Sequence, residues 1–251
     1  REQPMNRHSI TVAVLWAVFT VAGVLLVMNF SPFPVASSEQ AHVVDDAFTL
    51  LTYLSVPVFS LVVAMLLYSF VRFGQNDRPD EDGPPIHSHK GIAYIWVLLT
   101  TALTVVVIIH PGITGILELR ADDDNIDLVV QVEGQRFSWL AKYPEQNVQS
   151  RSELVLPVDE TVQFLVMASD VIHSLWIPGF RVKIDAVPGL TTKVTATPNV
   201  VGSYEKDVNF RLQCAELCGA GHAVMRMPVR VVERAEFDEW LSEQRPISAR
   251  R

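Results

Sequence analysis

The sequence has few cysteines and a deficit of basic residues. Only two cysteines occur among 251 residues, Cys214 and Cys218, far fewer than a disulfide-stapled scaffold uses. Lys and Arg number 20 against 28 Asp and Glu, a formal net charge of -8. Because nucleic-acid binding needs a basic surface, we expect no nucleic-acid partner and favour a basic protein partner. The sequence also lacks internal repeats and a C-x-x-C-H haem-attachment motif.

Charged residues are also scarce, at 19%, whereas 49% of the residues are hydrophobic. This composition is too apolar for an ordinary soluble domain, and the chain is too short for a transporter with many helices. A few membrane helices joined to one domain fit both observations.

Three apolar stretches are long enough to cross a bilayer as helices, which takes about 20 residues. They are Ile10–Phe30, Phe48–Val71 and Ile92–Ile116. The first follows Arg1 and Arg7, and residues 36–38 offer small side chains for cleavage, so a signal peptide is an alternative. Its apolar core exceeds the roughly 7 to 15 residues of a signal peptide, so we expect a retained helix.

Basic residues predict the orientation of these spans. Arg1 and Arg7 precede the first span, and Arg72, Arg78 and Lys90 lie between the second and third. The loop before the second span carries Glu39, Asp45 and Asp46 and no Lys or Arg. The positive-inside rule places the N-terminus in the cytoplasm and everything after Leu119 outside. We therefore expect a multi-pass protein of a bacterial or archaeal-type cell membrane, with its domain on the periplasmic side.

From Asp127 onward, short β-rich runs alternate with turn residues, which predicts an all-β sandwich or barrel. The runs are 127–134, 136–144, 153–160, 161–170, 180–189, 191–199, 203–213 and 225–233. A short amphipathic helix, Ala235–Glu243, is expected to close the domain. The predicted division is an N-terminal helix and outer loop (1–47), a two-helix hairpin (48–120) and the β-domain (121–251).

Two thiols, an imidazole and a thioether fall within twelve residues: Cys214, Cys218, His222 and Met225. Soft sulfur ligands mixed with imidazole suit copper. A second histidine, His173, lies in a turn-like segment and meets this loop if the domain folds back on itself. A single blue-copper ion uses one cysteine, so the second cysteine favours a pair of coppers.

Ordinary structural roles were weighed for each of these residues. A disulfide between Cys214 and Cys218 would leave the positions of the other ligand-type residues to coincidence. His173 alone would be a structural histidine and Met225 alone a core residue. We assign Met167 and Met227 to the core.

The pattern C-x-E-x-C-x-x-x-H-x-x-M, with His173 upstream, resembles the CuA segments of cytochrome c oxidase subunit II from about Phe48 to Val232. The resemblance implies a cupredoxin-like Greek-key barrel or sandwich on a two-helix membrane anchor, with the first span an extra N-terminal helix. It also implies that the two cysteines bridge two coppers. His173 and Met225 would complete the ligand set of one copper, and His222 and the backbone carbonyl of Glu216 would complete that of the other. The Glu216 carboxylate would face a Mg or Mn ion shared with subunit I.

The same resemblance implies a function. The chain would accept electrons one at a time from cytochrome c or a small copper protein. It would pass them to haem in subunit I, where oxygen is reduced to water and protons are pumped. Its partners would be subunit I, other oxidase subunits and membrane lipid. No catalytic nucleophile or acid–base pair is visible, so we expect an enzyme only as part of that complex.

Two departures from the family pattern affect the expected roles. Phe137 stands where the family has the Trp of electron entry, so either Phe137 or Trp139 marks the docking patch or a different carrier is used. Asp170 is a candidate for attracting a basic carrier to the patch. Asp185 and Glu133 are candidates of the same kind, and each of the three acids taken alone has the ordinary reading of a solvated charge. Ala93 stands where many relatives carry a proton-feeding Glu; the nearby titratable candidates are His87, His89 and Lys90.

Three alternatives differ in their partners or their copper. A CuA subunit of a nitric oxide reductase would have the same ligands but another catalytic subunit. A quinol-oxidase subunit II would lack the copper ligands. A membrane copper chaperone would hold exchangeable, usually single copper.

Overall fold

A computed structural model describes residues 7–73, 89–121, 125–244 and 246. The chain divides into two compact units. One is helical and comprises Arg1–Pro32 and Asp46–Thr114, and the other is β-rich and comprises Phe33–Asp45 and Gly115–Arg251. The functional division at residues 47 and 120 stays a prediction. Arg1 and His87 lie outside the described residues.

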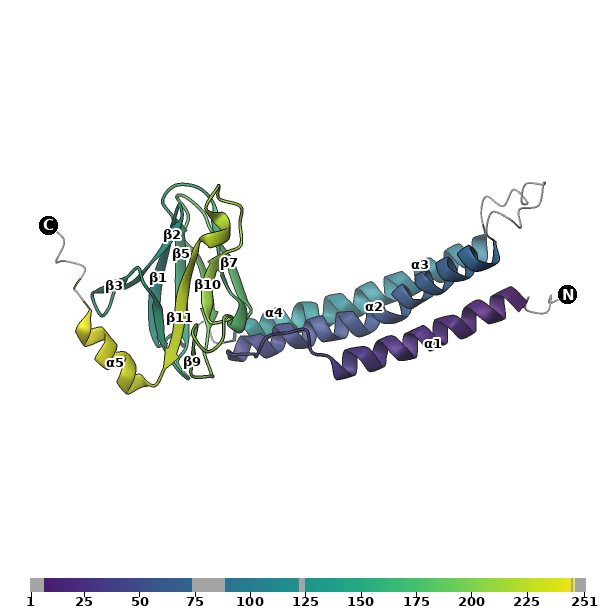
Figure 1. Cartoon of the computed structure of the whole chain (residues 1–251), viewed down its shortest axis with the longest axis horizontal. Coiled ribbons are helices and arrows are strands. Elements are labelled where there is room, and N and C mark those ends of the chain that lie inside the picture. The colour runs from purple at the N-terminus through teal and green to yellow at the C-terminus, as the bar shows by residue number, and fades with distance from the viewer. Residues whose placement is uncertain (1–6, 74–88, 122–124, 245, 247–251) are drawn as a thin grey trace. The chain divides into compact units, whose positions relative to one another are not determined.

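Within the described residues, three helices have the length and composition to cross a membrane: Arg7–Asn29, Glu39–Arg72 and Lys90–Leu119. They correspond to α1 (Arg7–Asn29), α2 (Glu39–Arg72), and α3 (Lys90–Val107) continued by the π-helix η2 (Ile108–Ile113) and α4 (Thr114–Leu119) (Figure 1). The predicted helices are therefore present. His89 caps α3 by accepting a hydrogen bond from the Ile92 N–H, and Lys90 and Ala93 lie in its first turn.

Helix α2 begins at Glu39, well before the predicted start at Phe48. The Oγ of Ser38 accepts a hydrogen bond from the Ala41 N–H at 3.2 Å, as an N-cap does. Gln40, one residue inside the helix, bonds the backbone N–H of Thr197 through its side-chain oxygen at 2.8 Å. These polar first turns pack on the β-unit, so an apolar-run criterion does not detect them.

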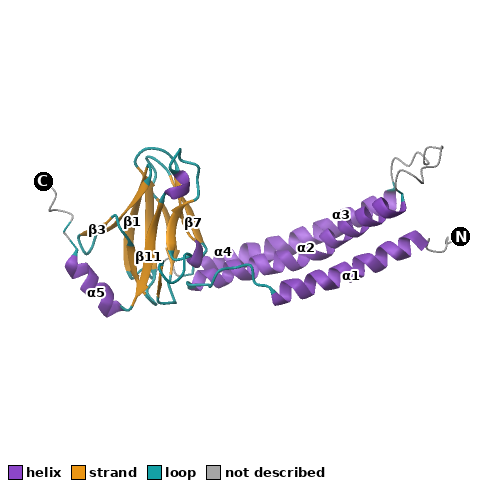
Figure 2. Ribbon diagram, viewed as in Figure 1, coloured by secondary structure: helices purple, strands orange, loops and turns teal. Residues whose placement is uncertain are grey.

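The β-rich unit is a sandwich of two sheets, shown as orange strands in Figure 2. The first sheet contains, in spatial order, β3 (Val148–Ser150), β2 (Ser138–Tyr143), β1 (Leu128–Gln135), β5 (Val162–Ala168) and β8 (Thr192–Ala196). The second contains β4 (Leu154–Pro157), β11 (Arg226–Val232), β10 (Arg211–Cys214), β6 (His173–Ile177) and β7 (Val182–Ala186), with β9 (Gly202–Ser203) paired to β11. Two short 3-10 helices, η3 (Pro178–Phe180) and η4 (His222–Val224), and α5 (Arg234–Glu243) complete the unit.

The predicted all-β, cupredoxin-like domain on a helical anchor is confirmed, with local differences. Strands β3 and β6 were not predicted; β6 is buried on both faces, so no alternation marks it. His173 is the first residue of β6 rather than part of a turn. The predicted run 203–213 is wrong in its middle, where Asp207 Oδ1 accepts the Asn209 N–H at 2.9 Å and holds a turn. Helix α5 is confirmed, one residue longer than expected.

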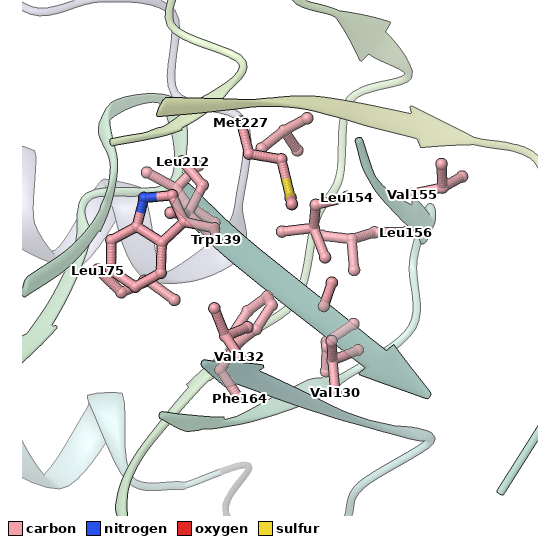
Figure 3. Packing of buried hydrophobic residues seen from close by; sticks show 14 of the residues in the cluster. Val130, Val132, Trp139, Leu154, Val155, Leu156, Phe164, Leu175, Leu212 and Met227 are labelled. Carbon is pink, nitrogen blue, oxygen red and sulfur yellow. The ribbon is translucent and has the colours of Figure 1, made fainter. Parts of the chain in front are cut away.

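The core lies between the two sheets (Figure 3). Alternate residues of β1 and β5, among them Val130, Val132 and Phe164, point into it, as a period of two requires. Trp139 and Tyr143 from β2 are also fully buried. The packed sheets hold the loops at the ends of the strands in defined positions.

The segment 33–45 belongs to the β-unit because Arg181 anchors it. The Arg181 side chain, only 9% exposed, forms a bidentate ion pair with Asp45, with N–O distances of 2.7 and 2.9 Å. Its remaining N–H groups donate to the backbone carbonyls of Pro34, Pro178 and Gly179. All five guanidinium donors therefore have acceptors, a fully satisfied buried ion pair.

Candidate metal centre

Strand pairing brings the first two candidate ligands together. Strands β10 and β6 are antiparallel, and Cys214 at the end of β10 pairs with Leu175. His173 begins β6 two residues earlier, on the same side of the ladder. The Cys214 Sγ consequently lies 3.8 Å from the His173 Nδ1.

The loop after β10 supplies the other ligands. Cys218 Sγ lies 3.8 Å from each of three atoms: Cys214 Sγ, His222 Nδ1 and Met225 Sδ. The 3-10 turn η4 reverses the chain between His222 and β11. The Met225 carbonyl accepts the Cys214 N–H at 3.0 Å, which closes the loop. His173 therefore meets four side chains that follow it by 41 to 52 residues, Cys214, Cys218, His222 and Met225.

Cys214 and Cys218 are free thiols, and the separation of their sulfur atoms suits metal binding. Their 3.8 Å separation is far longer than the roughly 2.05 Å of a disulfide bond. Two sulfurs at this separation subtend about 110° at an ion about 2.3 Å from each, close to a tetrahedral angle. The ligand atoms of His173, Cys214 and Cys218 all lie within 4.8 Å of one another. The donor set therefore fits a soft cation such as copper.

The centre is shielded from solvent. His173, Cys214, Cys218 and Met225 are buried, and His222 is half-buried. Burial, together with the neighbouring Cys214 thiol, raises the pKa of Cys218 to about 11. Because a thiolate pair is disfavoured there without a compensating positive charge, a cation has to displace the thiol protons.

Asp170 orients His173. The Asp170 Oδ1 lies 2.9 Å from the His173 Nε2, on the ring edge opposite the sulfurs. With Nε2–H donating to the carboxylate, Nδ1 keeps its lone pair toward the cysteines. Although desolvation opposes it, hydrogen bonds from Arg136, His173 and the Val171 N–H hold the pKa of Asp170 well below its usual range. The side chain predicted to attract a carrier is thus bound to the metal centre's histidine and to Arg136.

Phe137 covers the metal loop. A Cβ added to Gly221 would lie 2.4 Å from Cγ of the Phe137 ring, and one added to Gly219 would lie 3.3 Å from its Cε1. Gly219 also has a φ of +129°, which side chains with a Cβ rarely adopt. Sequence reasoning missed these two glycines; the signal that could have found them is the run Cys218-Gly-Ala-Gly-His222.

Trp139 lies on the other side of the ligands. It is buried in the core and packs edge-on against His173, with ring centroids 6.0 Å apart. Gly134 makes room for both rings, since a Cβ there would lie 3.0 Å from Trp139 and 3.1 Å from His173. Of the two candidate entry residues, only Phe137 therefore presents its ring to solvent.

Glu216 presents two groups in different directions. Its backbone oxygen accepts from the Cys214 Sγ at 3.1 Å, so the carbonyl lies beside the sulfurs. Its carboxylate is exposed. The predicted division of roles between carbonyl and carboxylate is compatible with this geometry.

Comparison with known proteins identifies relatives that match most of this chain. A family model described as the periplasmic domain of cytochrome c oxidase subunit II matches residues 136–233. Cytochrome c oxidase subunit 2 of Synechocystis sp. is 26% identical, over 95% of this chain and 83% of its own length. Cytochrome c oxidase subunit 2 of Bacillus subtilis is 31% identical, over 83% of this chain and 61% of its own length.

A solved structure is also similar to part of this chain. The crystal structure of the periplasmic domain of subunit II of cytochrome oxidase from Bradyrhizobium japonicum is 32% identical, with a TM-score of 0.44. The match covers 48% of this chain and 94% of that chain. The match to the family model spans Phe137 and all five converging side chains, and the match to the Synechocystis protein covers 95% of this chain, so it extends into the membrane helices. The chain belongs to the cytochrome c oxidase subunit II family, whose named members are subunits of an oxidoreductase complex.

Proposed function

We propose that this chain is the electron-input subunit of a respiratory terminal oxidase. Its binuclear CuA centre would be held by His173, Cys214, Cys218, His222 and Met225, with the Glu216 backbone oxygen as a further ligand. The observation that carries the proposal is the 3.8 Å spacing that links the five side chains around two facing thiols. A thiolate-bridged copper pair, when bound, supplies a one-electron redox centre whose charge change is shared by two metals.

The protein's own part in this chemistry is to fix the positions of the ligands and to exclude water from them. Cys214 and His173 lie on paired strands, so their separation is set by a backbone ladder. The carboxylate of Asp170 fixes the ring of His173. Burial of the thiols excludes water and leaves the ligand set nearly unchanged when one electron arrives or departs. A small structural change favours fast transfer in both directions.

The partners follow from this role. A soluble donor, cytochrome c or a small copper protein, would dock over Phe137 at the exposed face of the loop; Trp139 would support His173 from the core, and Asp170 would act through its hydrogen bond. Subunit I would receive the electron at its haem for reduction of oxygen to water with proton pumping. The Glu216 carboxylate would reach a Mg or Mn ion at that border. The N-terminus would lie in the cytoplasm and the copper domain in the periplasm, with lipid around the helices.

The alternatives are separated by specific observations. A copper chaperone exchanges its metal, whereas here the thiols are buried and closed in by Phe137. A copper-free quinol-oxidase subunit does not require five converging metal-ligand side chains. A nitric oxide reductase subunit would differ in its partner, so the haem subunit that co-purifies decides that case.

The test is electron paramagnetic resonance with copper analysis on the full chain in detergent. We expect two coppers per chain and hyperfine structure of one electron shared by two equivalent nuclei. Cys218→Ser should abolish that signal and electron input, whereas Met227→Leu, a buried methionine outside the cluster, should keep both. A single-copper signal, a Cys214–Cys218 disulfide, or unchanged electron input in Cys218→Ser would refute the proposal.

A further inference from the structure

Exposed apolar side chains gather at the end of the sandwich that holds the metal loop. They are Phe137 (38% exposed), Ile172 (48%), Leu190 (55%), Leu217 (78%) and Val224 (69%). Isolated exposed apolar residues are normal on protein surfaces, but a group of them gathered at one end of a domain is a candidate interaction surface. We call these five residues the apolar rim.

Strand register places the loops that carry the rim at one end of the unit. Gly134 of β1 pairs with Ala168 of β5, and Ala168 forms a bridge with Pro188. His173 pairs with Ala186 in the neighbouring sheet. The loops β1–β2, β5–β6 and β7–β8 therefore leave their strands at the same end.

The metal loop joins this group directly. It leaves β10 after Cys214, beside the start of β6, and carries Leu217 and Val224. The ring of Phe137 from the β1–β2 loop lies against Gly221 in that loop. Leu217 and Val224 are the chain neighbours of the ligands Cys218 and Met225, so a protein touching them is within a few bonds of the centre.

Several charged side chains near the apolar rim are already paired with opposite charges. Asp170 is held by Arg136 and by His173, at 3.2 and 2.9 Å. Glu133, a second candidate for attracting a basic carrier, is paired with Lys142 at 2.8 Å. Within the described chain, this end also carries the exposed acids Asp185 and Glu216 and the exposed base Arg226. Screening limits the reach of charges elsewhere in the chain to about 8 to 10 Å at physiological salt.

We propose that the apolar rim is the docking surface for the electron donor, and that the donor is a small redox protein with an apolar contact face around its own cofactor. This rests on the proposed function, since it names the partner of that site. Apolar contact, rather than charge pairing, supplies the affinity. Electron input then depends only weakly on ionic strength, unlike association steered by complementary charges.

The experiment uses the intact oxidase complex and two probe donors. One is a small blue-copper protein with an apolar face around its copper, and the other is a c-type cytochrome ringed by lysines. For the wild type, we expect the blue-copper donor to give the higher kcat/KM, changing less than about threefold between about 10 and 200 mM salt. Charge-steered input would fall about tenfold or more over that range.

Variants locate the surface. L190S combined with L217S should raise the KM for the blue-copper donor about five- to tenfold with little change in kcat, as loss of exposed contact residues does. V208S is the matched control and should leave KM unchanged. Val208 is 58% exposed, against 55% for Leu190 and 78% for Leu217, but lies in the turn before β10, at the other end of that strand. A preference for the basic cytochrome with steep salt dependence, or unchanged KM in the double variant, would overturn the docking proposal.

Electron injection from a small photoreductant distinguishes failure of the docking proposal from failure of the proposed electron-input function. Injected electrons should reach copper in wild type and in the L190S/L217S variant alike, because no docking is needed. If both accept photo-electrons and only the donor kinetics disagree, the docking surface is wrong and the electron-input function stands. If the wild type accepts no photo-electrons, the proposed function is refuted, and the docking proposal, which rests on it, is refuted as well.

Discussion

The ring of Phe137 lies so close to Gly221 that a Cβ on the glycine would be 2.4 Å from Cγ of the ring. The two residues are far apart in sequence, yet their contact seals the loop that carries Cys218, His222 and Met225. Because the ring comes from the β1–β2 turn, the first sheet thereby braces a metal loop that belongs to the second.

This contact predicts that Gly221→Ala displaces either the ring or the loop. We expect the variant to lose copper to a chelator faster than wild type and to show a changed copper spectrum. Phe137→Ala in the same chain removes the clashing atoms, so the double variant should recover part of the retention. Independent, additive losses in the double-mutant cycle would show that the contact has no such role.

The hydrogen bond between Asp170 and His173 predicts a metal-affinity effect. Asp170→Asn keeps the shape of the side chain but loses the charge that orients Nε2–H. We expect copper affinity to fall about 10- to 100-fold, the usual effect of removing a carboxylate partner of a ligating histidine. Glu133→Gln, which breaks an ion pair with Lys142 instead, is the control and should bind copper normally. Equal affinities in chelator competition for Asp170→Asn and wild type would contradict the assigned role.

The fully buried Tyr143 predicts a stability effect. Its hydroxyl donates to the Val155 carbonyl at 2.8 Å and accepts the Val155 N–H at 3.0 Å. Tyr143→Phe leaves both backbone groups unpaired, so we expect a loss of about 1 to 3 kcal/mol. The half-buried Tyr204, changed to Phe, should alter stability by less than about 0.5 kcal/mol. Thermal unfolding of the detergent-solubilised chain, followed by near-ultraviolet circular dichroism, measures both.

Tyr143 also predicts a pH dependence. Desolvation by burial raises its pKa far above the ordinary value of 10.0. The folded state thus binds the phenol proton more tightly than the unfolded state, so the stability contribution is complete below about pH 10 and declines as the pH rises further. The difference in unfolding temperature between wild type and Tyr143→Phe should therefore shrink above pH 10. A difference that stays constant or widens there would show that Tyr143 ionises normally in the folded state.

The ion pair of Arg181 with Asp45 predicts that segment 33–45 depends on one side chain. Arg181→Gln leaves a carboxylate and several carbonyls unpaired in a nearly buried site, so we expect a destabilisation of about 3 to 5 kcal/mol. Limited proteolysis should then cleave within residues 33–45. Lys193→Gln, a change of an exposed cation on β8, should leave that segment protected. Equal protection in the two variants would mean that two backbone hydrogen bonds hold the segment without Arg181, those from the Ser37 N–H to the Gly179 carbonyl and from the Glu39 N–H to the Thr197 carbonyl.

Much of the fold was predictable because its signals are local. Three apolar stretches predicted the helices, and the alternation in β1 and β5 predicted those strands. Strand β6 escaped because it is buried on both faces and shows no alternation. The start of α2 at Glu39 escaped because its first turns are polar and are stabilised by contacts with the distant Thr197.

The sequence by itself determined the chemistry of the candidate site, because residue type and spacing set which ligand atoms one loop offers. Cys214, Cys218, His222 and Met225 are close in sequence and were identifiable without a fold. Tertiary structure decided what lies around them: Phe137 over the loop, Trp139 in the core and Asp170 bound to His173. These relationships depend on strand register and side-chain packing between segments far apart in the chain, and neither leaves a trace in local composition.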